Sequence, residues 1–132
     1  MQAKNSQLII SILIIVPVAL CYGLLPNFAF PILFDLRMET TDLKNSFRAM
    51  MGLYLGMAAI WAMGIVKPRF WSIATMTSVF FMAGLATGRF ISLLTDGLPS
   101  PVFSVGLIVE LILAIWGIRN LKKYGVTENN NK

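Results

Sequence analysis

The sequence predicts an all-α integral membrane protein, a bundle of four membrane-spanning helices in one domain. Hydrophobic residues make up 57% of the 132 residues and charged residues only 13%, whereas a soluble chain carries about a quarter charged residues. The mean hydropathy is +0.74. The apolar residues form four blocks, each close to the roughly 20 residues that cross a bilayer. We expect helices over residues 8–25, 42–66, 70–95 and 101–119 of a domain spanning 1–123, with a disordered tail at 124–132.

The first apolar block, residues 8–25, has two interpretations. Lys4 precedes it, as a basic residue precedes the apolar core of a signal peptide. The core is long, however, no small-residue cleavage site follows it, and bulky Leu20 stands before Cys21. We therefore interpret the block as a retained first span, which Pro17 is expected to kink.

The second span is expected to begin before its apolar block. Thr41 is suited to the N-cap, and Asp42 in the first turn is favoured by the helix dipole. The preceding segment 26–39 is too short to cross a bilayer and contains two prolines. It is either an interfacial cap over the outer mouth or an ordinary loop, and the sequence leaves both open.

The last two spans form a short hairpin. Gly97 is expected to take the turn after the third span. Ser100 and Pro101 have the residue types of an N-cap and a first helical position for the fourth span.

The formal net charge of +5 reflects topology rather than a nucleic-acid partner. If the chain crosses four times, most basic residues fall on one side of the membrane. By the positive-inside rule, both termini and the turn after the second span are then cytoplasmic. These basic residues are Lys4, Lys67, Arg69, Arg119, Lys122, Lys123 and Lys132.

Cysteine and histidine usage narrows the chemistry. Cys21 is the only cysteine and there is no histidine. A disulfide within the chain, a paired-thiol redox motif, imidazole ligation of a metal or haem, and a serine–histidine nucleophile are therefore excluded. We predict no catalytic residue, no metal site and no cofactor, and favour a protein that is not an enzyme.

Three charged residues lie within the predicted spans. From the helix rise, Arg48 lies about 9 Å, Arg89 about 10 Å and Glu110 about 15 Å from the outer helix ends. A charge at mid-bilayer costs about 2.5–3.5 kcal/mol, so such residues face the bundle and find partners. We expect Arg89 to pair with Glu110 across the hairpin and Arg48 to lie near them. The alternatives are that Arg89 extends alone to the headgroups, and that Glu110 is protonated and bonded to a neighbouring backbone.

Small residues recur at four-residue spacing beside these charges. Gly52 and Gly56 follow Arg48, and Gly84 and Gly88 lead to Ser92. Such spacing lets helices approach closely. We therefore expect the four glycines to form helix-packing faces that coincide with the charged faces. Tyr54 either lines the same interior or faces lipid.

These residues also carry a family resemblance. The chain resembles, over about residues 8–120, a family of small bacterial four-span membrane proteins described as a domain of unknown function. That family is in turn similar to the DoxX-like four-helix membrane proteins. The resemblance implies the fold, the bacterial cytoplasmic (inner) membrane and a structural role for Asp96, Gly97 and Pro99. Some DoxX-like proteins accompany thiol or quinone redox systems, but this chain lacks the cysteines for thiol work. The pattern consists of Asn45, Arg48, Gly52, Tyr54, Gly56, Gly84, Arg89, Ser92, Asp96, Gly97, Pro99 and Glu110.

Three functions remain open. The favoured one is binding of an anionic amphiphile, a lipid or quinone-like molecule, because two arginines exceed the charge of Glu110 alone. Its expected ligand-binding residues are Arg48, Tyr54, Arg89, Ser92 and Glu110. The second is a subunit or assembly factor of a larger membrane complex, and a homodimer also stays open. The third is proton-linked transport of a small solute. Membrane lipids are the expected partners in each case.

Overall fold

The computed structural model describes residues 3–34, 37 and 39–129, and their ordered elements are all helices. The all-α fold class is confirmed, since these residues contain no strand. Four helical stretches are long and apolar enough to cross a membrane: Ala3–Gly23, Thr41–Val66, Pro68–Thr95 and Pro101–Gly125. The elements in chain order are η1 (Ala3–Asn5), α1 (Ser6–Gly23), α2 (Pro26–Phe34), α3 (Thr41–Val66), η2 (Pro68–Phe70), α4 (Trp71–Thr95) and α5 (Pro101–Asn129).

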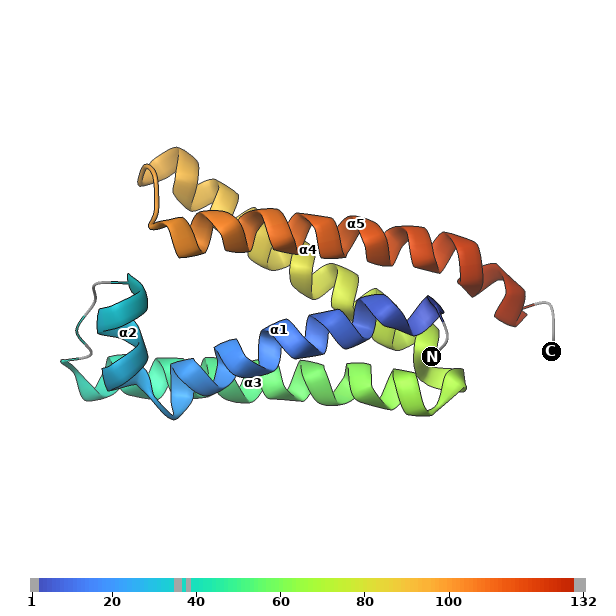
Figure 1. The fold of residues 1–132 in the computed structure, drawn as a ribbon, viewed down its shortest axis with the longest axis horizontal. Coiled ribbons are helices and arrows are strands. Elements are labelled where there is room, and N and C mark those ends of the chain that lie inside the picture. The colour runs from blue at the N-terminus through green and yellow to red at the C-terminus, as the bar shows by residue number, and fades with distance from the viewer. Residues whose placement is uncertain (1–2, 35–36, 38, 130–132) are drawn as a thin grey trace.

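The long helices form two antiparallel pairs that are close at one end and apart at the other. Helix α1 lies beside α3, and α4 lies beside α5 (Figure 1). The tight turn through η2 keeps α3 and α4 together at the end where the N-terminus lies. The pairs diverge towards the opposite end, where the short helix α2 stands (Figure 1). This divergence opens the interior at the wide end.

The narrow end is closed by a buried polar cluster. Gln7 of α1 is fully buried and donates through Nε2 to Ser78 Oγ at 2.9 Å and Ser11 Oγ at 3.2 Å. The same amide group reaches the carbonyl oxygen of Leu113 at 3.4 Å. Because hydrocarbon offers no competing partner, these bonds tie α1, α4 and α5 together.

Close helix packing occurs at glycines other than the four expected at packing faces on the second and third spans. A Cβ on Gly64 of α3 would collide with the Cβ of Ala74 of α4, and one on Gly117 of α5 would collide with Val79 of α4. The absence of a side chain at both positions therefore permits the observed helix contacts.

The four glycines expected at packing faces lie elsewhere. Gly52, Gly56, Gly84 and Gly88 are exposed, and a Cβ on any of them would meet no atom within 4 Å. The expectation that they bring helices of this chain together was therefore wrong. Four-residue spacing defines one face of a helix, but it does not determine which neighbour that face meets.

Several helix boundaries also differ from the expected ones. The N-cap of α3 is Thr40 rather than Thr41, and its Oγ1 accepts the Leu43 N–H at 3.2 Å. Helix α5 continues to Asn129 instead of ending near residue 119, so residues 124–129 of the expected tail are helical. No proline follows residue 119, and the good helix formers Leu121, Lys122 and Lys123 continue the helix beyond the apolar block. Lys132 lies outside the described residues.

The segment after α1 is a helix rather than an ordinary loop. Pro26 is the first residue of α2, a position where its missing N–H costs nothing. Phe30 is 2% exposed and packs on Phe47 of α3 in a T-shaped contact with ring centroids 4.4 Å apart. Its ring also lies 5.6 Å from that of Tyr22. Aromatic packing thus holds α2 over the wide end of the bundle.

The hairpin between α4 and α5 follows the sequence expectation with one exception. Gly97 has a φ of +94°, the left-handed conformation that favours glycine. Pro101 is the first residue of α5, as predicted. The Ser100 side chain does not cap the helix, since its buried Oγ has no partner among the described residues. Its carbonyl oxygen instead accepts the Phe103 N–H at 3.0 Å.

Candidate functional site

A cavity of about 220 Å³ lies between the two helix pairs near the wide end. All five α-helices contribute to its wall. Most of the wall is apolar, with Ile15 of α1, Met82 of α4 and Leu113 of α5 among the buried residues that line it. The polar groups of the wall come from Cys21, Tyr22, Tyr54, Arg89 and Glu110.

The predicted pair of Arg89 and Glu110 is present and forms one side of this cavity. The Nε–H of Arg89 is shared between both carboxylate oxygens of Glu110, each at 2.9 Å. The Arg89 side chain is 22% exposed and that of Glu110 is 9% exposed. The prediction of an ion pair across the α4–α5 hairpin is therefore confirmed. Arg89 therefore does not extend alone to the headgroups, and Glu110 bonds Arg89 rather than a neighbouring backbone.

The guanidinium group of Arg89 is held in place by α5. Its Cζ lies 5.1 Å from the centre of the Phe103 ring, a cation–π contact. The group also packs on Gly106, where a Cβ would lie in ordinary van der Waals contact with Cζ at 3.5 Å. Nε of Arg89 bonds Glu110, and the Tyr22 side chain also forms a hydrogen bond with Arg89. The terminal nitrogens of a guanidinium group carry more N–H groups than this one bond uses. The two terminal nitrogens therefore retain N–H donors beside the cavity.

Two tyrosines from the α1–α3 pair also line the cavity. Tyr54 of α3 was predicted as a site residue and lines the cavity with 4% exposure. Tyr22 of α1 was not predicted. The rings of the two tyrosines lie 6.0 Å apart, and both side chains interact electrostatically with Arg89 and Glu110. A tyrosine near the outer end of the first span, at the level of the predicted pair, was the available sequence signal.

The cavity is bounded at the wide end by an aromatic stack between α2 and α5. The rings of Phe34 and Phe103 lie 4.6 Å apart at an angle of only 16°. Both residues line the cavity. Phe103 therefore contacts both Arg89 of α4 and Phe34 of α2.

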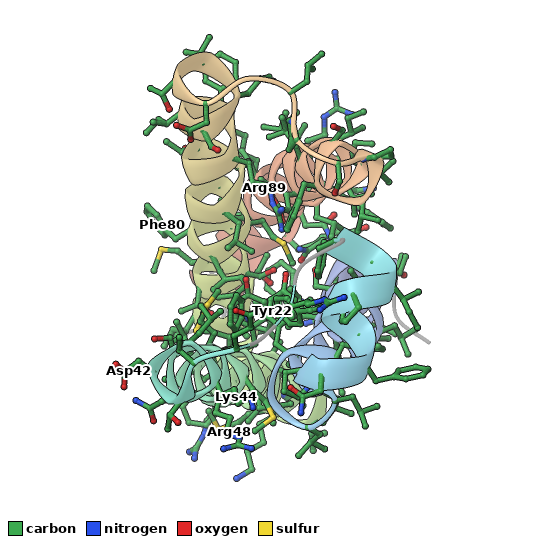
Figure 2. All side chains as sticks on the ribbon, turned by 90° about the vertical axis from the view of Figure 1, so that its left-hand side faces the viewer. Tyr22, Asp42, Lys44, Arg48, Phe80 and Arg89 are labelled. Atoms are coloured by element: carbon green, nitrogen blue, oxygen red, sulfur yellow. The ribbon has the colours of Figure 1, made fainter. Side chains whose placement is uncertain are left out.

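Arg48 lies away from this cavity. Its side chain is exposed on α3, and Figure 2 shows it pointing away from the bundle whereas Arg89 points inward. It does not line the cavity. The expected convergence of Arg48 with Arg89 is therefore wrong. The helix rise gives the position of a residue along α3, but it carries no information on the direction of its side chain around the helix axis. The cavity holds one cationic and one anionic side chain among the described residues, so the two charges balance.

A second hollow, of about 320 Å³, lies outside Arg89. Gly88, Ser92 and Pro99 line it together with Arg89 and Phe103, which also line the inner cavity. The predicted site residue Ser92 therefore lies in this outer hollow and not in the cavity.

The comparisons with known proteins identify the family alone. Residues 4–119 match the family described as a domain of unknown function, DUF4345. The chain therefore belongs to this family. No curated protein and no solved structure gives a significant match. The cavity and its charged pair thus stand as the main guide to function.

Proposed function

We propose that this DUF4345 member is a multi-pass membrane protein that binds an apolar molecule bearing hydrogen-bond acceptor oxygens between its two helix pairs. The observation that carries the proposal is the environment of Arg89. A permanently charged group borders a largely apolar cavity. Glu110 bonds its Nε and Tyr22 also bonds the side chain, yet the terminal nitrogens carry more N–H groups than these two partners use. A ligand oxygen would accept a hydrogen bond from one of these N–H groups.

The donors of Arg89 restrict the chemistry of the ligand. Glu110 occupies Nε, while the terminal nitrogens present N–H groups in the planar fork that matches a carboxylate or phosphate. A quinone carbonyl would also accept one of these bonds. Because Arg48 lies elsewhere, an excess of positive charge no longer argues for an anion. The remaining N–H donors of Arg89 favour a ligand with acceptor oxygens, and anionic lipids and quinones both provide such oxygens.

The cavity is large enough for part of such a molecule. At about 220 Å³, it exceeds the roughly 150 Å³ of an apolar cavity that binds a benzene ring. Ile15, Met82 and Leu113 would contact the apolar part, while the hydroxyl groups of Tyr22 and Tyr54 offer further polar contacts. A ring or a short length of acyl chain therefore fits between the pairs.

The charge pattern suggests how the cavity is oriented in the membrane. The N-terminus, the η2 turn and the later part of α5 lie at the narrow end (Figure 1), and these segments carry Lys4, Lys67, Arg69 and Lys122. The positive-inside rule would then place both termini in the cytoplasm and the cavity in the outer half of the membrane. The family resemblance would make this membrane the bacterial inner membrane.

The test is to identify what the protein retains on purification. Wild type, Arg89→Gln, Gly106→Leu and the control Gly84→Leu would be purified in a mild detergent, and bound small molecules quantified by mass spectrometry. Gly106 lines the cavity, whereas Gly84 faces open space and lines neither the cavity nor the outer hollow. We expect one acceptor-bearing amphiphile in wild type and Gly84→Leu, and its loss from both site variants. Equal retention in all four proteins would reject the proposal.

A second candidate, a subunit of a larger membrane complex, is favoured by the exposed glycine faces. Gly52 and Gly56 on α3, and Gly84 and Gly88 on α4, are free of contacts within the chain. Small residues four apart suit association with another helix. Affinity purification would test this function. A stoichiometric partner lost in Gly52→Leu would support it, and a protein that elutes alone in every variant would oppose it. Proton-linked transport is less favoured, because Glu110 is the one carboxylate among the described residues that line the cavity, and no second one continues a proton path there.

A further inference from the structure

Arg89 lies between two spaces of different character. The inner cavity and the outer hollow share Arg89 and Phe103 in their walls. The inner cavity is largely apolar, whereas the outer hollow lies beside the α4–α5 turn, next to Ser92 and Pro99. A molecule with its acceptor group at Arg89 would therefore have one part in each space.

Arg89 offers hydrogen-bond donors to the outer hollow, and Ser92 offers it a hydrogen-bond acceptor. The Ser92 hydroxyl donates its proton to Asp96 Oδ2 at 2.8 Å, so Ser92 Oγ keeps only lone pairs for a ligand. Asp96 does not itself line the hollow, but this bond holds its carboxylate next to Ser92, which does. Both groups would accept hydrogen bonds from N–H or O–H donors. A cationic donor would also be attracted to the charge of Asp96.

We propose that the two spaces together bind a phospholipid-like amphiphile whose headgroup carries an ammonium group. This inference rests on the proposed function and names its ligand class. The phosphodiester would accept from the terminal nitrogens of Arg89, and the apolar chain would occupy the inner cavity. The ammonium group would lie in the outer hollow, near Ser92 and Asp96. A phosphoethanolamine headgroup matches this order of groups, whereas a fatty acid satisfies Arg89 but leaves the hollow empty.

The native cysteine offers a direct readout of cavity occupancy. Cys21 is the only cysteine of the chain and lines the inner cavity. A molecule bound there should slow alkylation of Cys21 in detergent micelles. Two probes of equal chain length would be titrated, a single-chain phosphoethanolamine lipid and a fatty acid. Inorganic phosphate would serve as a probe without a chain.

Two substitutions would alter the outer hollow at residues that do not line the inner cavity. Gly88 lines the hollow and has open space around it, so Gly88→Leu would fill the hollow with little strain. Asp96→Asn would remove the charge that faces the ammonium group. Gly84→Leu is the matched control, one turn away and outside both spaces.

The expected result is a selective loss of one probe. In wild type and Gly84→Leu, both chain-bearing probes should protect Cys21, and inorganic phosphate should not. In Gly88→Leu and Asp96→Asn, the concentration of phosphoethanolamine lipid that half-protects Cys21 should rise at least about tenfold. The corresponding concentration of the fatty acid should change by less than about twofold. Equal behaviour of the two probes in these variants would overturn the inference. If neither chain-bearing probe protects wild-type Cys21, the proposed function itself fails.

Discussion

A single N–H group of Arg89 bonds both carboxylate oxygens of Glu110, each at 2.9 Å. This geometry joins α4 to α5 in the part of the bundle where the two helix pairs diverge, and it leaves the terminal nitrogens of the guanidinium group available. The same ion pair therefore supports the fold and prepares a site for a ligand.

The ion pair should show measurable energetic coupling. Replacing either partner alone leaves the other charge unpaired in a partly buried setting, and replacing both removes that penalty. For Arg89→Ala, Glu110→Ala and the double variant, we expect a coupling of about 0.5–3 kcal/mol in the free energy of unfolding. Denaturant titration in mixed micelles gives this value. Additive single effects would mean that the pair contributes no coupling to stability.

Glycine substitutions should divide into two classes according to position. Gly117→Val places a side chain against Val79 and should lower the free energy of unfolding by about 1–3 kcal/mol. Gly84→Val meets open space, so its effect should stay within about 0.5 kcal/mol. The comparison uses the same micelle assay. A large loss in Gly84→Val would instead reveal a contact with a second chain.

The stack of Phe34 on Phe103 should control access to the cavity. Aromatic pairs contribute about 0.5–1.5 kcal/mol beyond their buried area. Phe34→Ala should therefore speed Cys21 alkylation by roughly two- to tenfold, since 1.4 kcal/mol corresponds to a factor of ten. Phe28→Ala is the control on the same helix, because Phe28 is 67% exposed and does not line the cavity. Equal rates in both variants and wild type would show that α2 does not limit access.

The proposed orientation predicts which hairpin ends face the outside. In a Cys21→Ser background, Leu98→Cys lies in the α4–α5 turn and Val66→Cys lies at the opposite end of the bundle. Both native side chains are well exposed. A membrane-impermeant thiol reagent should label Leu98→Cys in intact cells and Val66→Cys only after lysis. The reverse pattern would place the cavity in the inner half of the membrane.

Local signals in the sequence were sufficient for the spans and for the charged pair. The rise of a helix placed Arg89 and Glu110 at neighbouring depths, and a short hairpin left few other partners for either residue. Gly97 and Pro101 were predictable for similar local reasons, since each satisfies a backbone requirement within its own turn.

Features that depend on the packing of separate helices were not predictable in this way. Arg48 has the same depth as Arg89 but points away from the bundle, because depth gives no information on rotation about the helix axis. Gly23, Gly64 and Gly117 are sites of close contact, although none of them was among the four glycines expected at packing faces. In the sequence, Tyr22 is indistinguishable from an ordinary interfacial tyrosine, because its contact with Tyr54 depends on the packing of α1 on α3.

The central claim, that an acceptor-bearing amphiphile occupies the cavity beside Arg89, is tested most directly by photocrosslinking. A fatty acid with a diazirine in its chain would be bound and irradiated, and the modified peptides mapped by mass spectrometry. The account predicts adducts on cavity residues such as Ile15, Met82 and Leu113, which are lost in Arg89→Gln. Adducts confined to outward-facing residues such as Leu53, Phe80 and Ile112, unchanged in Arg89→Gln, would contradict it.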